Sequence, residues 1–124
     1  MSHNRRILGQ GGESTAVDFL RRQGYTILET NFTTKNGEID IVAAIDDILV
    51  FTEVKTRKST FLGSPLAAVT SKKQRQISKV ALGYLKLHKL FDNDARFDVI
   101  AVQLQPSGPP RIEHIENAFD LNYG

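Results

Sequence analysis

The chain has 124 residues, of which 40% are hydrophobic and 24% are charged. This composition is ordinary for a globular protein, and the length is that of a single domain covering residues 1–124. The absence of cysteine excludes disulfides, thiolate zinc sites and cysteine nucleophiles. No apolar stretch is long enough to span a membrane, and no apolar core follows the basic N-terminus. We therefore expect a cytoplasmic protein with no membrane partner.

The N-terminal third predicts a helix followed by a strand. Residues 1–8 are expected to be a flexible tail. Apolar residues at helical spacing predict a helix over Gly12–Gln23, and Gly24 is a typical C-terminal stop. A strand is predicted over Tyr25–Phe32. Asn36-Gly37 is a strong turn signal that leads into the next strand.

Residues 38–56 predict a β-hairpin centred on Asp46-Asp47. A symmetric hairpin pairs residues whose numbers sum to 93, so Asp40 should lie opposite Glu53 and Glu38 opposite Lys55. Because strand side chains alternate between faces, these four should share one face. Like charges placed opposite each other destabilise a sheet. A chain that keeps two facing carboxylates there is expected to use them to hold a cation.

Both faces of this hairpin are largely apolar, so we expect both to be covered. The expected carboxylate face carries Val42, Ala44, Leu49 and Phe51, and the expected opposite face carries Ile39, Ile41, Ala43, Val50 and Val54.

The C-terminal half predicts a second helix and further strands. The predicted segments are a polar, mobile loop (57–65), a short helix from Pro65 to Val69, a helix capped by Thr70 or Ser71 and ending near His88, a loop (92–94), a strand (96–104) and a short edge strand (112–115). The order α-β-β-β-α-β, with a small β addition, predicts an α/β fold with a mixed central sheet flanked by helices.

Asp40 and Glu53 are the strongest candidates for chemistry. Carboxylate oxygens suit Mg²⁺ or Mn²⁺, and the backbone carbonyl of Val54 could supply a third oxygen. Such an ion stabilises charge on a phosphoryl group and activates water, and Lys55 could orient that water. The alternative is two solvated carboxylates at a strand end, with Glu38 and Lys55 as an ordinary cross-strand ion pair.

The arrangement of Asp40 and Glu53-Val54-Lys55 after a helical acid resembles the restriction-endonuclease-like, or PD-(D/E)xK, nuclease superfamily, whose core order is also α-β-β-β-α-β. A longer pattern is similar to the YraN family of small bacterial proteins, which are of uncertain function and resemble archaeal Holliday-junction resolvases. That pattern comprises Gly9, Gly12-Glu13, Ala16, Gly24-Tyr25, Asn31-Phe32, residues 37–40, residues 51–57, Gly63, Lys73 and residues 96–99. Thr52 departs from the family pattern, in which valine is commoner at this position.

The resemblance implies a role for Glu13, which matches the acid on the first helix and would approach the metal or a bridging water. The alternative is an acidic residue in the first turn of a helix, where it is favourable to the helix dipole.

A basic set after the hairpin could contact phosphates: Arg57, Lys72, Lys73, Arg75 and Lys79. The alternative for the helical members is a solvated helix face. Asp98 lies in an apolar strand and needs a partner, for which Arg96 is expected. The three histidines, His3, His88 and His114, are scattered and receive no role.

These observations favour a Mg²⁺- or Mn²⁺-dependent nuclease, or a nuclease-like protein, that acts on structured or branched DNA. Asp40 and Glu53 would bind metal, with Lys55 and Glu13 assisting. A homodimer would suit a substrate with two equivalent strands. The alternatives are a non-catalytic nucleic-acid-binding or scaffold module that retains the fold, and an enzyme that cleaves RNA.

Overall fold

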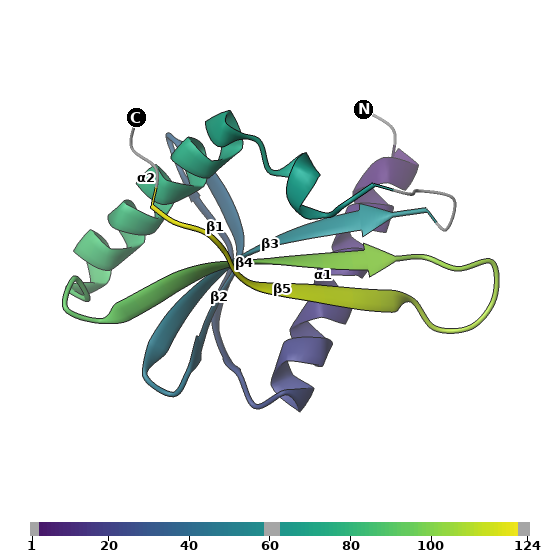
Figure 1. The fold of residues 1–124 in the computed structure, drawn as a ribbon, viewed down its shortest axis with the longest axis horizontal. Helices are drawn as coiled ribbons and strands as arrows, with labels where there is room; N and C mark the ends of the chain where they lie inside the picture. Colours follow the sequence, from purple (N-terminus) through teal and green to yellow (C-terminus); the bar gives the residue numbers. More distant parts are fainter. Residues whose placement is uncertain (1–2, 59–62, 122–124) are drawn as a thin grey trace.

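The computed structural model describes residues 3–58 and 63–121, with the backbone alone for residues 3–10. The chain forms the predicted α-β-β-β-α-β order with a final strand (Figure 1). The elements are α1 (His3–Arg22), β1 (Thr26–Thr34), β2 (Gly37–Ile45), β3 (Ile48–Arg57), the 3-10 helix η1 (Leu66–Ala68), α2 (Ser71–His88), β4 (Asp94–Gln103) and β5 (Arg111–Phe119).

The strands form one sheet in the order β1-β2-β3-β4-β5. β3 and β4 are parallel, and every other neighbouring pair is antiparallel. A parallel pair needs a long crossover, which the segment containing α2 supplies between β3 and β4. The predicted mixed central sheet is therefore confirmed.

The two helices cover different faces of this sheet. Figure 1 shows α1 crossing behind the central strands, whereas α2 runs past the other end of the sheet. The α1 side buries Ala16, Leu20, Tyr25, Ile41, Ala43, Val50, Ile100 and Val102. The α2 side buries, among others, Ile39, Val42, Phe51, Val80, Tyr84, Phe97 and Val99. The expectation that both faces of the hairpin are covered is confirmed.

The β2–β3 hairpin has the predicted register. Its pairs run from Ile45–Ile48 to Ile41–Thr52, and their numbers all sum to 93. Asp46 and Asp47 have φ values of 48° and 65°. Two successive positive φ values are typical of the tight turn whose twist matches that of a hairpin.

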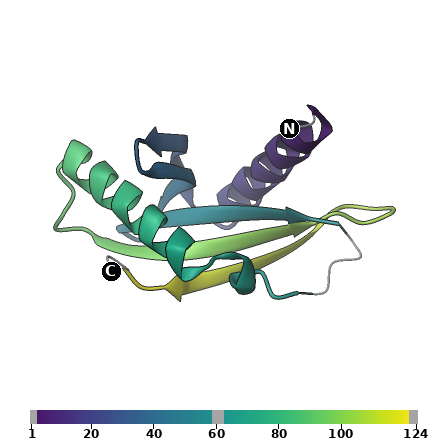
Figure 2. The same ribbon diagram turned by 90° about the horizontal axis from the view of Figure 1, so that it is seen from above.

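Strict alternation fails at the start of β2, where Ile39 packs on the α2 side and not on the opposite face as predicted. The neighbouring strand β1 has Asn31 in the left-handed region, with φ 55°. Figure 2 shows the curled part of the β1–β2 hairpin, in dark blue, rising out of the layer of central strands between the two helices. Phe32, paired with Ile39, then meets the Tyr84 ring edge-on. Packing against α2 thus outweighs the simple strand period.

Helix α1 begins at His3, earlier than the predicted start at Gly12. It therefore includes residues 3–8, which were expected to be a tail, while residues 1–2 lie outside the described chain. Gly12 lies inside the helix, where a Cβ atom would overlap the Thr56 hydroxyl and lie 3.1 Å from Thr56 Cβ. Its missing side chain lets α1 approach β3 closely. Gly24, with φ 95°, follows the helix as predicted.

Helix α2 matches its prediction from cap to end. Thr70 caps it by accepting a hydrogen bond at Oγ1 from the Lys73 N–H, 3.2 Å away, and the helix ends at His88. The short helix after Pro65 is also confirmed.

The predicted strand bounds were less accurate. β1 extends to Thr34, β4 begins at Asp94 inside the predicted loop, and β5 is longer than the predicted 112–115. The prediction of a mobile loop falls partly on residues 59–62, which lie outside the described chain. Neither helix, as far as described, is long and apolar enough to cross a bilayer.

Candidate functional site

Asp40 occupies the place where β2 and β3 separate. The backbone ladder between these strands ends, within the described chain, at the Ile41–Thr52 pair. One residue beyond it, Asp40 Oδ2 accepts a hydrogen bond from the Val54 N–H at 2.8 Å. A side-chain carboxylate thus takes the partner that a backbone carbonyl would have in a continuous ladder, and it lies between the two strands.

The surroundings of Asp40 disfavour its charge. Burial is the largest cause, the nearby charge of Glu53 adds to it, and together they raise the Asp40 pKa to about 7. The Val54 N–H and Lys55 oppose this rise but do not cancel it. The charge of Glu53 thus acts on Asp40 in the folded chain, and the expectation that the two hold a cation stays a prediction. A nearby cation would relieve the charge of both.

Glu53 is almost fully buried, with 6% of its surface exposed. Burial raises its pKa, and the ammonium groups of Lys73 and Lys55 lower it in part. Glu53 Oε1 lies 3.5 Å from Lys55 Nζ and 3.8 Å from Lys73 Nζ. Lys55 comes from the same strand and Lys73 from the first turn of α2, so the carboxylate joins β3 to α2.

The cross-strand ion pair of the alternative interpretation does not form. Lys55 forms its ion pair with Glu53 and not, among the described residues, with Glu38. The Glu38 carboxylate instead accepts a hydrogen bond from Thr33 Oγ1 on β1, 3.2 Å away. Glu38 follows β1 because the curled part of the hairpin departs from β3. Its charge still contributes to the raised pKa of Asp40.

Glu13 approaches the same opening from α1. Its Oε1 accepts a hydrogen bond from Asn31 Nδ2 at 2.7 Å. Burial, and then the charge of Asp40, raise the pKa of Glu13. Glu13 on α1 is therefore near enough to Asp40 for the two charges to interact. Asn31 was not predicted, although an asparagine within a strand sequence is the residue type that best tolerates a left-handed backbone.

The backbone of Val54 also faces this opening. In an extended strand the N–H and C=O of one residue point to the same edge, because a hydrogen-bonded pair exchanges both bonds. Since the Val54 N–H points to Asp40, its carbonyl faces β2 as well. Two carboxylates and one carbonyl suit Mg²⁺, which keeps several waters and needs few protein ligands. In the described chain no three histidine, cysteine or acidic side chains form a ready cage.

The predicted phosphate-binding residues are placed differently from one another. Lys73 contacts Glu53, whereas Lys72 is exposed and Arg75 half-buried on the first turns of α2. Arg57 Nη1 donates a hydrogen bond to the Gly63 carbonyl at 2.5 Å, which ties the end of β3 to the residues before η1. Lysines, with no acid, occupy the first turn of α2. This end of the molecule is thus basic around the buried Glu53 and the half-buried Asp40.

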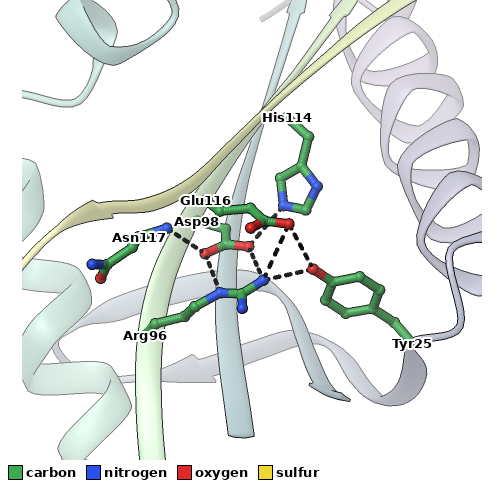
Figure 3. A network of polar contacts seen from close by, with 6 residues as sticks. All are labelled: Tyr25, Arg96, Asp98, His114, Glu116 and Asn117. Carbon is green, nitrogen blue, oxygen red and sulfur yellow. Dashed lines mark hydrogen bonds and ion pairs between the residues drawn. The ribbon is translucent and has the colours of Figure 1, made fainter. Parts of the chain in front are cut away.

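A second polar cluster lies on the α1 side of the sheet (Figure 3). Asp98 is fully buried, and its carboxylate receives hydrogen bonds from Arg96 at 3.0 and 3.1 Å and from the Asn117 N–H at 2.9 Å. His114 Nε2 lies 2.7 Å from Asp98 Oδ2. Burial alone would raise the Asp98 pKa, but the hydrogen bonds outweigh it and lower the pKa.

This cluster confirms the predicted Arg96–Asp98 pair and adds His114, which was given no role. Because an ionised carboxylate only accepts hydrogen bonds, the ring Nε2 must carry the proton. Arg96 also donates to the Tyr25 hydroxyl. Both oxygens of the Asp98 carboxylate are satisfied by the chain itself, and the cluster joins β4 and β5 to Tyr25, which lies just before β1. We therefore regard it as structural.

The fold and site define a mixed α/β protein, compatible with a nuclease-like core, that carries a half-buried and a buried carboxylate beside two lysines where two strands separate. Residues 12–102 match the uncharacterised protein family UPF0102. A UPF0102 protein of Trichlorobacter lovleyi is 54% identical over 117 residues, covering 94% of this chain and 92% of the relative. One of Geobacter sulfurreducens is 51% identical over 122 residues, covering 98% and 95%. The chain belongs to the UPF0102 family, which confirms the YraN-like resemblance.

Proposed function

We propose that the protein is a metal-dependent nuclease that hydrolyses phosphodiester bonds in structured or branched DNA. The observation that carries this proposal is the insertion of Asp40 between β2 and β3 beside the buried Glu53. A half-buried carboxylate whose ionisation is opposed by a buried neighbouring carboxylate is poorly explained as a stabilising feature. The two are well explained as ligands for a cation.

In this proposal Asp40, Glu53 and the Val54 carbonyl hold Mg²⁺ or Mn²⁺. The ion supplies charge stabilisation at the phosphate and acidifies a bound water. Lys55, whose ammonium lies 3.5 Å from Glu53 Oε1 and whose side chain is 29% exposed, is available to orient water or to contact a phosphate oxygen. Glu13 supports the site from the opposite helix.

The DNA would lie across the basic end of the molecule. Lys72, Lys73, Arg75 and Arg57 would contact the phosphate backbone, which provides most of the non-specific affinity in such complexes. A substrate with two equivalent strands would suit a homodimer. Analytical ultracentrifugation with and without four-way junction DNA measures that directly.

The decisive experiment compares cleavage of junction, duplex and single-stranded DNA and of RNA, each with Mg²⁺, Mn²⁺ or EDTA. We expect metal-dependent cutting of DNA by the wild type and its loss in Asp40→Ala. Asp47→Asn, in the exposed hairpin turn, is the matched control and should cut normally. Equal traces of cutting in wild type and Asp40→Ala would indicate contamination and refute the enzyme.

A non-catalytic nucleic-acid-binding module is the second candidate. It is favoured by the two lysines that already compensate Glu53, since such a site can be neutral without an ion. This candidate predicts DNA binding that is equal in wild type and Asp40→Ala and unchanged by EDTA, with no cutting of any substrate. RNA cut faster than DNA would redirect the proposal to a ribonuclease.

A further inference from the structure

Five non-glycine residues of the described chain have a positive φ, and most of them have an evident structural reason. Asp46 and Asp47 form the hairpin turn, and Lys89 ends α2 in the left-handed conformation common after helices. Asn117 forms the bulge in β5 and directs its N–H to the buried Asp98. The remaining residue is Asn31, with φ 55° inside β1.

The conformation of Asn31 costs free energy, because a left-handed residue inside a strand is unfavourable even for asparagine. This backbone conformation places the Asn31 side chain against Glu13 on α1. Asn31 Nδ2 lies 2.7 Å from Glu13 Oε1, and this hydrogen bond is exposed. Exposed hydrogen bonds add little to stability, since water competes for both groups. The bond is therefore poorly explained as a stabilising contact.

The same residue lies across from Asp40. The β1–β2 ladder pairs Thr30 with Ile41 and Phe32 with Ile39, so Asn31 falls at the level of Asp40. Asn31 thus lies in the curl at the level of Asp40 and also binds Glu13, the acid on α1.

We propose that Asn31 is a positioning residue that holds Glu13 toward Asp40 and so completes the cation site between β2 and β3. The inference rests on the proposed function. Partners that orient metal ligands typically contribute about 10- to 100-fold to metal affinity or activity. We place Asn31 at the lower end of that range because its bond to Glu13 is exposed.

The test is a double-mutant cycle on Mn²⁺ affinity, measured by electron paramagnetic resonance on the full chain. The variants are Asn31→Gly, Glu13→Ala and the double variant. Glycine adopts the left-handed backbone without strain, so Asn31→Gly removes the amide and should fold. Asn117→Gly is the matched control, because it removes an exposed amide from another left-handed position in a strand while keeping its backbone N–H.

We expect Asn31→Gly to weaken Mn²⁺ binding about tenfold and the double variant to bind no more weakly than Glu13→Ala. Asn117→Gly should bind like the wild type. A purely structural role would make the two losses multiply, and that outcome, or unchanged binding in Asn31→Gly, overturns the inference. Wild type that binds Mn²⁺ no better than Asp40→Ala overturns the proposed function itself. Binding lost in Asp40→Ala but kept in Asn31→Gly overturns the inference alone.

Discussion

Replacing Asp40 by asparagine should make the protein more stable at alkaline pH and equally stable at acid pH. The asparagine side chain keeps an oxygen that can accept the Val54 N–H, so the hydrogen bond at 2.8 Å can be retained. What it removes is a negative charge that burial and Glu53 both disfavour. A stabilising substitution of this kind is typical of residues retained for function.

The magnitude follows from the pKa of Asp40, which is about 7 in the folded chain against an ordinary 3.8. Between these values the folded protein holds a proton that the unfolded chain has lost, so stability falls as the pH rises from 3.8 to about 7 and levels off above that. At about 1.4 kcal/mol for each pH unit, the upper limit is about 4 kcal/mol. Since Asp40 and Glu53 share the penalty and water reaches part of the site, we expect on the order of 1–3 kcal/mol.

The assay is urea unfolding of wild type and Asp40→Asn at pH 5 and pH 8, in EDTA and then with Mn²⁺. Asp47→Asn measures the general effect of removing one exposed negative charge. Without metal the gain in stability of the variant over wild type should be larger at pH 8 than at pH 5, and Mn²⁺ should stabilise the wild type alone. A variant less stable than wild type at both pH values by the same amount would refute the reasoning, because the carboxylate would then make a favourable contact.

Four further substitutions test the parts of the structure around this site. Gly12→Ala should lower the free energy of unfolding by about 1–2 kcal/mol, despite better helix propensity, because α1 must move away from β3. Thr52→Val should raise it by about 1 kcal/mol, since the buried Thr52 hydroxyl has no hydrogen-bond partner in the described chain. Asp98→Asn should lower it by about 3 kcal/mol in urea unfolding without changing Mn²⁺ affinity. Lys73→Ala should reduce the salt-dependence slope of DNA binding by about 1, whereas Lys86→Ala, at the other end of α2, should not.

Local chemistry determines the features that the sequence predicts well. The Asp46-Asp47 turn and the two-residue period determine the hairpin register, and Thr70 with the apolar stripe determines α2. The pairing of Asp98 with Arg96 follows because a buried carboxylate requires a partner. In each case the decisive residues are close together in the chain.

Features set by distant contacts were missed. The start of β2 turns toward α2 because Phe32 and Ile39 pack near Tyr84, which lies far away in the sequence. His114 reaches Asp98 only because β5 pairs with β4. The signal that could have found it is its position two residues after Ile112, which places both side chains on the same face of the strand. Asn31 was missed because its role depends on a bond to another element, α1.

Asp40 and Glu53 are stabilised unequally by their neighbours, and this difference bears on how a substrate would engage the site. Glu53 has two ammonium partners, whereas Asp40 has, within the described part of the chain, one hydrogen bond from a neutral N–H, and its pKa is raised to about 7. A cation entering the opening would therefore relieve Asp40 most. It would also weaken the ion pair between Glu53 and Lys73, whose side chain is 37% exposed. A lysine released in this way can bind a phosphate, so cation binding and DNA binding should strengthen each other if the nuclease proposal is right. Independent binding of the two would instead favour the non-catalytic module.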